Sequence, residues 1–134
     1  MDSPDKDTIL KTMIYVCKIS PGKIYVFGGS VVHPAFNLKR ARRFSNNVDF
    51  YVPGEDTFEK IRSMFELSDM AGIPYSIING LYAFFFVGEI EGLKLPYVPP
   101  QVFQTDQGDI YTLPLPLIAA LKFRRGILKA TKGH

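Results

Sequence analysis

The segments Ile24-Tyr25-Val26-Phe27-Gly28-Gly29-Ser30 and Asn47-Val48-Asp49-Phe50-Tyr51-Val52 decide the fold of this chain. Each contains a short run of β-branched and aromatic residues, which is typical of a buried strand. The first run ends in Gly28, Gly29 and Ser30, where small residues let a ligand approach the backbone and where a following helix would favour an anion. If the two strands are neighbours, this turn faces the carboxylate of Asp49, which could hold Mg²⁺. Two alternatives remain. The Gly28-Gly29-Ser30 segment could be a turn without a ligand, and the Asp49 carboxylate could pair with a nearby arginine.

The rest of the chain alternates helical and strand patterns. Asn79-Gly80 is a typical hairpin turn between two of the strands, and Pro99-Pro100 predicts the start of a loop. Ser30 can cap a short helix. Apolar spacing and turn residues predict helices over residues 3–17, 55–71 and 113–129, and strands over 23–27, 48–52, 74–78, 81–87, 89–98 and 109–111.

This order of elements predicts an α/β (α+β) fold in which helices pack against a mixed β-sheet. No repeat or long linker divides residues 1–134, so we expect a single domain. The strand over 82–86 is almost entirely apolar. It should therefore be central in the sheet or covered by a partner subunit, which would make the protein a homo-oligomer.

The composition restricts the function classes. The chain of 134 residues is 46% hydrophobic and 22% charged, with a formal net charge of +3, which is compatible with an anionic ligand. Cys17 is the single cysteine and lies in an apolar run, so it predicts a buried structural thiol, no internal disulfide and a reducing, cytoplasmic setting. The apolar runs are far shorter than the ~20 residues that span a bilayer, which predicts no membrane association.

The two central segments, taken together, resemble the nucleotidyltransferase superfamily. Gly28-Gly29-Ser30 is similar to its glycine-glycine-serine turn, and Arg43-x-Ser45-x-Asn47-Val48-Asp49-Phe50 is similar to its Asp-x-Asp metal strand with the preceding arginine. The closest branch includes the minimal nucleotidyltransferases and the toxins of type IV toxin–antitoxin systems. Near the C-terminus, the segment 113–122 resembles the helix that carries a lysine close to the nucleotide phosphates, here Lys122.

The resemblance implies magnesium-dependent transfer of a nucleoside monophosphate from an NTP to an acceptor. It further implies nucleotide-binding roles for Gly28, Gly29, Ser30, Arg43 and Lys122, because the glycine turn and the lysine contact triphosphate in that family. Minimal members of the family often need a small helical partner protein. Asp49 would bind metal, with Asn47 as a second oxygen ligand.

Two departures from the family pattern put activity in doubt. Asn47 stands where the family has its first aspartate, and a neutral amide oxygen lacks the charge that holds a divalent cation. The third carboxylate is ambiguous: Glu91 is the preferred catalytic partner of Asp49, with Glu89 and Asp109 as other candidates. The sequence therefore leaves three hypotheses. They are an NTP- and Mg²⁺-dependent enzyme, a degenerate relative that binds a nucleotide, RNA or a protein without catalysis, and a structural or oligomeric protein without a ligand.

The basic residues near the C-terminus also have two interpretations. Lys122, Arg124, Arg125 and Lys129 alternate with apolar residues, which is typical of an amphipathic helix that packs on a core. Together with the basic segment 39–43, they could instead form a nucleic-acid surface.

Overall fold

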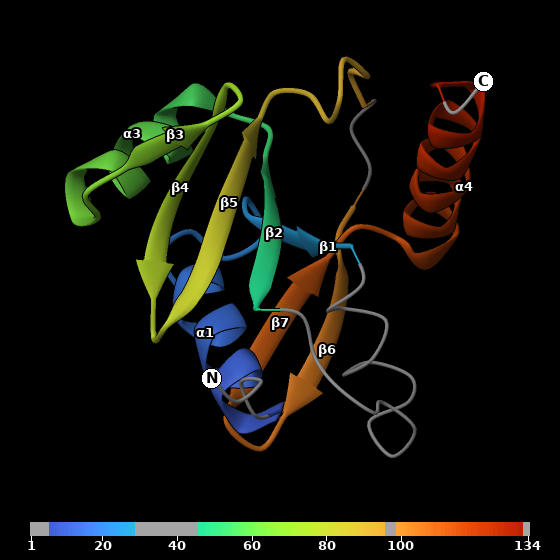
Figure 1. The fold of residues 1–134 in the computed structure, drawn as a ribbon. Helices are drawn as coiled ribbons and strands as arrows, with labels where there is room; N and C mark the ends of the chain where they lie inside the picture. Colours follow the sequence, from blue (N-terminus) through green and yellow to red (C-terminus); the bar gives the residue numbers. More distant parts are fainter. Residues whose placement is uncertain (1–5, 29–45, 96–98, 133–134) are drawn as a thin grey trace.

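The computed structural model describes residues 6–28, 46–95 and 99–132. Its described elements are arranged as one sheet with helices beside it (Figure 1). In chain order they are α1 (Lys6–Cys17), β1 (Tyr25–Phe27), β2 (Asn47–Val52), α3 (Glu55–Met64), β3 (Ser68–Met70), β4 (Ile73–Ile78), β5 (Leu81–Val87), β6 (Gln101–Thr105), β7 (Gly108–Thr112) and α4 (Leu115–Lys132).

The described strands form a seven-stranded sheet in the order β3-β4-β5-β2-β1-β7-β6. β2 is parallel to β5 and β1 is parallel to β7, whereas the other neighbouring pairs are antiparallel. The prediction of a mixed sheet with helices beside it is therefore confirmed. β5 lies in the interior of the sheet, as the apolar run over 82–86 predicts.

The main part of the hydrophobic core lies between one face of the sheet and the helices α1 and α3, and Phe27 and Tyr51, on the same face as Asp49, are buried as well. Phe50 of β2 and Phe85 of β5 stack in this layer, with ring centroids 5.6 Å apart, and both are fully buried. Ile9 and Met13 of α1 and Ile61 of α3 belong to the same buried cluster. Cys17 is also buried, and burial raises the pKa of its thiol to about 11, which suits a structural rather than a reactive cysteine.

The predicted helix over 55–71 is too long. α3 ends at Met64, and Phe65 is already extended, with φ −127°. The chain then forms β3, which pairs with β4 through a turn in which Ala71 and Gly72 both have positive φ. Gly72 thus belongs to a hairpin turn and does not end a helix, because strand pairing with β4 outweighs the helical pattern of the sequence.

The predicted strand over 89–98 is also wrong for its described part. Residues 89–93 form a turn with a single bridge between Ile90 and Leu93, and Glu91 has a positive φ of 51°. The sequence missed β6, which follows Pro99-Pro100 and pairs along its whole length with β7. β7 itself confirms the strand predicted around 109–111.

α4 packs on the sheet with only part of its length. Ile118 is buried and Leu121 is half-buried, but Phe123 is 72% exposed. In Figure 1, α4 stands beyond β1, away from α1 and α3. The interpretation of this helix as an amphipathic packing helix therefore holds only for its first half. Among the described residues, no helix is both long and apolar enough to cross a membrane.

Candidate functional site

The glycine turn begins directly above Asp49. β1 ends at Phe27, which pairs with Asp49 across the sheet, and Gly28 follows with φ +97°. A Cβ atom on Gly28 would lie 3.0 Å from Oδ2 of Asp49, so a side chain at this position would press on the carboxylate. Both the backbone angle and the close approach therefore require glycine. The expected adjacency of the first strand and the Asp49 strand is present.

Asp49 is a half-buried carboxylate whose charge is only partly compensated. Burial raises its pKa above the ordinary range for aspartate, and the negative charge of Glu91 acts in the same direction. A hydrogen bond from Nδ2 of Asn47 to Oδ1, at 3.3 Å, and the positive charge of Arg125 lower the pKa, but they are smaller effects than burial. Asn47 and Asp49 thus lie side by side on one face of β2, where the sequence predicts both as metal ligands.

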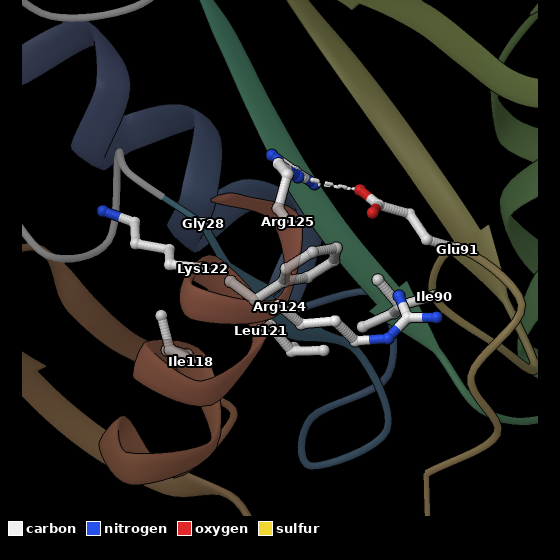
Figure 2. A pocket seen from close by; sticks show the side chains of 9 residues that line it. Gly28, Ile90, Glu91, Ile118, Leu121, Lys122, Arg124 and Arg125 are labelled. Atoms are coloured by element: carbon white, nitrogen blue, oxygen red, sulfur yellow. Dashed lines mark hydrogen bonds and ion pairs between the residues drawn. The ribbon is translucent and has the colours of Figure 1, made fainter. Parts of the chain in front are cut away.

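Glu91 reaches the same region from the turn that follows β5. Ile90 beside it is 1% exposed and anchors the turn in the core. The Glu91 carboxylate forms an ion pair with Arg125 of α4, in which Nε donates to Oε1 at 2.8 Å and a second guanidinium nitrogen contacts the same oxygen (Figure 2). The ion pair joins the turn to α4 across the end of β1.

A narrow pocket lies between α4, the end of β1 and the 89–93 turn. It holds about 30 Å³, room for roughly one or two water molecules. Its walls combine apolar side chains with three cations of α4 (Figure 2). The lining residues are Phe27, Gly28, Ile90, Glu91, Ile118, Leu121, Lys122, Arg124 and Arg125.

Three of the residues predicted from the sequence, Gly28, Glu91 and Lys122, therefore line one pocket, and Asp49 lies against Gly28. The predictions for Gly29, Ser30 and Arg43 fall outside the described residues. Asp109 is not part of this group: Val26 of β1 pairs with Thr112 in the parallel β7, so Asp109 lies three residues back, toward the opposite end of the sheet. Glu89 does not line the pocket.

Arg124 and Arg125 line the pocket, although the sequence analysis assigned them only to a packing helix or a nucleic-acid surface and not to the nucleotide site. Helical spacing could have assigned Arg125 to the nucleotide site. Arg125 follows Lys122 by three residues and therefore lies on the same side of α4. What the sequence could not supply is the position of the 89–93 turn, which gives Arg125 its partner Glu91.

The described donor set does not fit a pair of magnesium ions. No group of three or more His, Cys, Asp or Glu side chains in residues 6–28, 46–95 and 99–132 is arranged to hold a metal. The amide nitrogen of Asn47 points at Asp49, burial favours the protonated form of Asp49, and Arg125 already neutralises Glu91. Two-metal phosphoryl transfer needs several charged oxygen ligands at one place, so we derive no step through bound metal.

The chain has a nucleotidyltransferase-like fold. It is similar in structure to a Thermotoga maritima protein, TM1012, described as a putative nucleotidyltransferase, with a TM-score of 0.67 over 99% of this chain and 92% of that chain. The sequences are 16% identical, so the likeness establishes the fold alone. No family model matches the sequence, and no curated protein matches it significantly.

Proposed function

We propose that this protein is a degenerate relative of the nucleotidyltransferases that binds an NTP without transferring its nucleoside monophosphate. One observation carries the proposal. Gly28 lies in one pocket with three cations of α4, and the Asp49 carboxylate beside it has a raised pKa. A glycine turn offers backbone N–H groups to phosphate, and Lys122 and Arg124 add positive charge. The assignment of this chain to the branch of minimal nucleotidyltransferases and type IV toxins stays a prediction.

The charge of Arg125 supports binding that does not require magnesium. In a metal-dependent site, the cation screens the repulsion between phosphate and the protein carboxylates. Here the guanidinium of Arg125 already pairs with Glu91 and lowers the pKa of Asp49, so the same screening comes from a side chain. The NTP is then held at the mouth of the pocket, because the pocket itself is too small for a nucleotide.

Magnesium-dependent transfer is the second candidate function. One observation favours it: Glu91 lines the pocket that also includes Gly28, and Asp49 lies against Gly28, so two carboxylates lie in one region. Glu91 would have to leave Arg125 before both carboxylates were free to act. A helical partner protein or a second copy of the chain, contacting exposed α4 residues such as Phe123, also stays a prediction.

Calorimetric titration of ATP, GTP, CTP and UTP, with Mg²⁺ and with EDTA, tests the proposal. We expect binding in both conditions. Lys122→Ala should weaken it by about tenfold or more, because a charge-assisted hydrogen bond is lost. The matched control is Lys129→Ala, which removes an exposed lysine of α4 that does not line the pocket, and it should change the affinity less than about twofold. Glu91→Gln should tighten binding, since it frees Arg125 for phosphate.

Other results would contradict the proposal in distinct ways. Binding that needs Mg²⁺ and disappears in Asp49→Ala, together with release of pyrophosphate, would establish the second candidate. Absence of NTP binding in every condition would exclude nucleotide binding and leave only the fold.

A further inference from the structure

The open face of the sheet carries an aromatic platform beside the candidate nucleotide site. We define the platform as Tyr75 of β4 and Tyr82 and Phe84 of β5. The ring of Tyr75 lies 5.7 Å from that of Tyr82 and 5.6 Å from that of Phe84, centroid to centroid. The rings of Tyr82 and Phe84 are nearly parallel, with an interplanar angle of 17°. Three rings thus form one continuous surface.

The alternation of the strands fixes the platform on the same face as Asn47 and Asp49. Asn47 pairs with Tyr82 and Asp49 pairs with Phe84 across the β2–β5 ladder. Paired residues point to the same side of a sheet, whereas Ala83 and Phe85 point to the opposite side, into the core under α1 and α3. The platform therefore continues directly from the candidate nucleotide site.

Among the described residues, 6–28, 46–95 and 99–132, the platform lies on an open part of the sheet. Its three rings are half-buried, and Ile77, which pairs with Tyr82 on the same face, is 60% exposed. The helices α1 and α3 share the core with Phe50 and Phe85 and so pack on the opposite face, and in Figure 1 α4 stands beyond β1, away from β4 and β5. No described helix therefore covers these rings.

The neighbouring charge indicates what kind of ligand would lie on these rings. Up to Lys129, α4 carries the four cations Lys122, Arg124, Arg125 and Lys129, and its sequence contains no acidic residue. A row of cations beside stacked aromatic rings is the combination by which proteins hold single-stranded nucleic acid, since the phosphates follow the cations and the bases stack on the rings. A second copy of this chain would also supply aromatic contacts, but its formal net charge is +3, so it offers less charge complementarity to α4 than a polyanion does.

The distances across the sheet suit one strand of nucleic acid. The pocket under α4 lies over β1, Phe84 lies two strands away on β5, and Tyr75 lies three strands away on β4. With strands about 4.8 Å apart, these spans are about 10 and 14 Å. A short oligonucleotide can therefore place a phosphate against α4 and its next bases over the platform.

We propose that the aromatic platform binds unpaired bases of a single-stranded nucleic acid whose phosphates lie along α4. This inference rests on the proposed function in one respect: both assign phosphate contacts to the cations of α4. It adds a second class of ligand beside the same site, which mononucleotide binding alone does not require.

Fluorescence anisotropy with labelled ten-nucleotide RNA and DNA, single-stranded and duplex, tests the proposal. We expect single strands to bind more tightly than duplex, and Phe84→Leu and Tyr82→Leu each to weaken single-strand binding by about tenfold or more. Leucine keeps apolar volume in the sheet but removes the flat ring, and circular dichroism verifies that the variants fold. Tyr15→Ala is the matched control, because Tyr15 is an exposed tyrosine of α1 on the other side of the sheet and should leave binding unchanged.

The remaining outcomes overturn the proposal. Equal binding of single strand and duplex, unaffected by the platform variants, would mean that α4 binds phosphate without base stacking. No oligonucleotide binding alongside intact ATP binding would exclude the platform while leaving the nucleotide site in place. A wild-type dimer in light scattering that dissociates in Tyr82→Leu, without any change in oligonucleotide affinity, would assign the platform to a second copy of the chain.

Discussion

The two faces of the same two strands, β2 and β5, differ sharply in what they do. On one face, Phe50 and Phe85 are 0% exposed and pack under α1 and α3. On the other, Asp49 and Phe84 are half-buried; Asp49 lies against Gly28 of the narrow pocket, and Phe84 belongs to the aromatic platform. A shift of one residue along a strand thus separates a residue of the core from a residue of the candidate site.

The difference shows that stability and binding are divided between alternate positions. The core face excludes water and is closely packed, so burial of its apolar residues dominates the free energy of unfolding. The open face retains groups that are costly to bury, above all the Asp49 carboxylate, whose raised pKa reflects that cost. Three variants measure how strict the division is.

Phe85→Ala should produce the largest loss of stability. Removing a fully buried phenylalanine ring leaves a cavity between the sheet and the helices, and the free energy of unfolding should fall by about 3–5 kcal/mol. Urea denaturation followed by circular dichroism measures this value. Its matched control is Phe84→Ala, one residue away on the open face, for which we expect less than about half that loss because the ring is half-buried. Equal losses would contradict the division between the faces.

Gly28→Ala should have an intermediate effect. The new methyl group would require a left-handed backbone at φ +97° and would lie 3.0 Å from Oδ2 of Asp49. We expect a loss of about 2–3 kcal/mol in the same denaturation assay. Gly22→Ala separates the two causes, since Gly22 has φ +79° but no atom within 4 Å of the added Cβ. A Gly28→Ala loss no greater than the Gly22→Ala loss would mean that the contact with Asp49 is unimportant.

Asp49→Asn should have the smallest effect, and its sign depends on pH. Because the pKa of Asp49 is raised, the folded protein binds its proton more tightly than the unfolded chain does. Its contribution to stability is therefore full below the ordinary aspartate pKa of about 3.9 and falls as pH rises through the folded pKa. At pH 7, Asp49→Asn should stabilise the fold by on the order of 1 kcal/mol, and the gain should vanish near pH 3.

Thermal unfolding between pH 3 and pH 8 measures the effect of Asp49→Asn. Asp106→Asn, at an exposed position in the β6–β7 turn, is the control and should show no such trend. A gain that stays constant across this range would show that the ionisation of Asp49 does not influence stability.

Two hairpin turns show how far sequence patterns reach in this chain. Asn79-Gly80 and Ala71-Gly72 adopt the same geometry, with positive φ at both central residues. Asparagine and glycine tolerate that geometry, so the first turn was predicted correctly. Alanine does not favour positive φ, so the second turn resembled the end of a helix. Pairing of β3 with β4 holds Ala71 in that conformation, together with a hydrogen bond from the backbone N–H of Gly72 to Oδ2 of Asp69 at 3.0 Å.

Some features of the candidate site could likewise be predicted from the sequence, and others could not. The sequence indicated Gly28, Asp49, Asn47 and Lys122 because local motifs carry them, and the pairing of Phe27 with Asp49 follows once β1 and β2 are neighbours. The Glu91–Arg125 ion pair could not be predicted, because its partners lie 34 residues apart and meet through the 89–93 turn. Gly29, Ser30 and Arg43 lie outside the described residues and stay predictions.

The sequence by itself determined the strands β1, β2, β4, β5 and β7, the mixed sheet and the glycine at the end of β1, because these depend on local backbone preferences and on the alternation of apolar residues. Only the tertiary structure decided where α3 ends, which face of the sheet stays open, and how Arg125 reaches Glu91. These features depend on contacts between residues far apart in the chain, whose free energies outweigh local propensity only after the strands have paired.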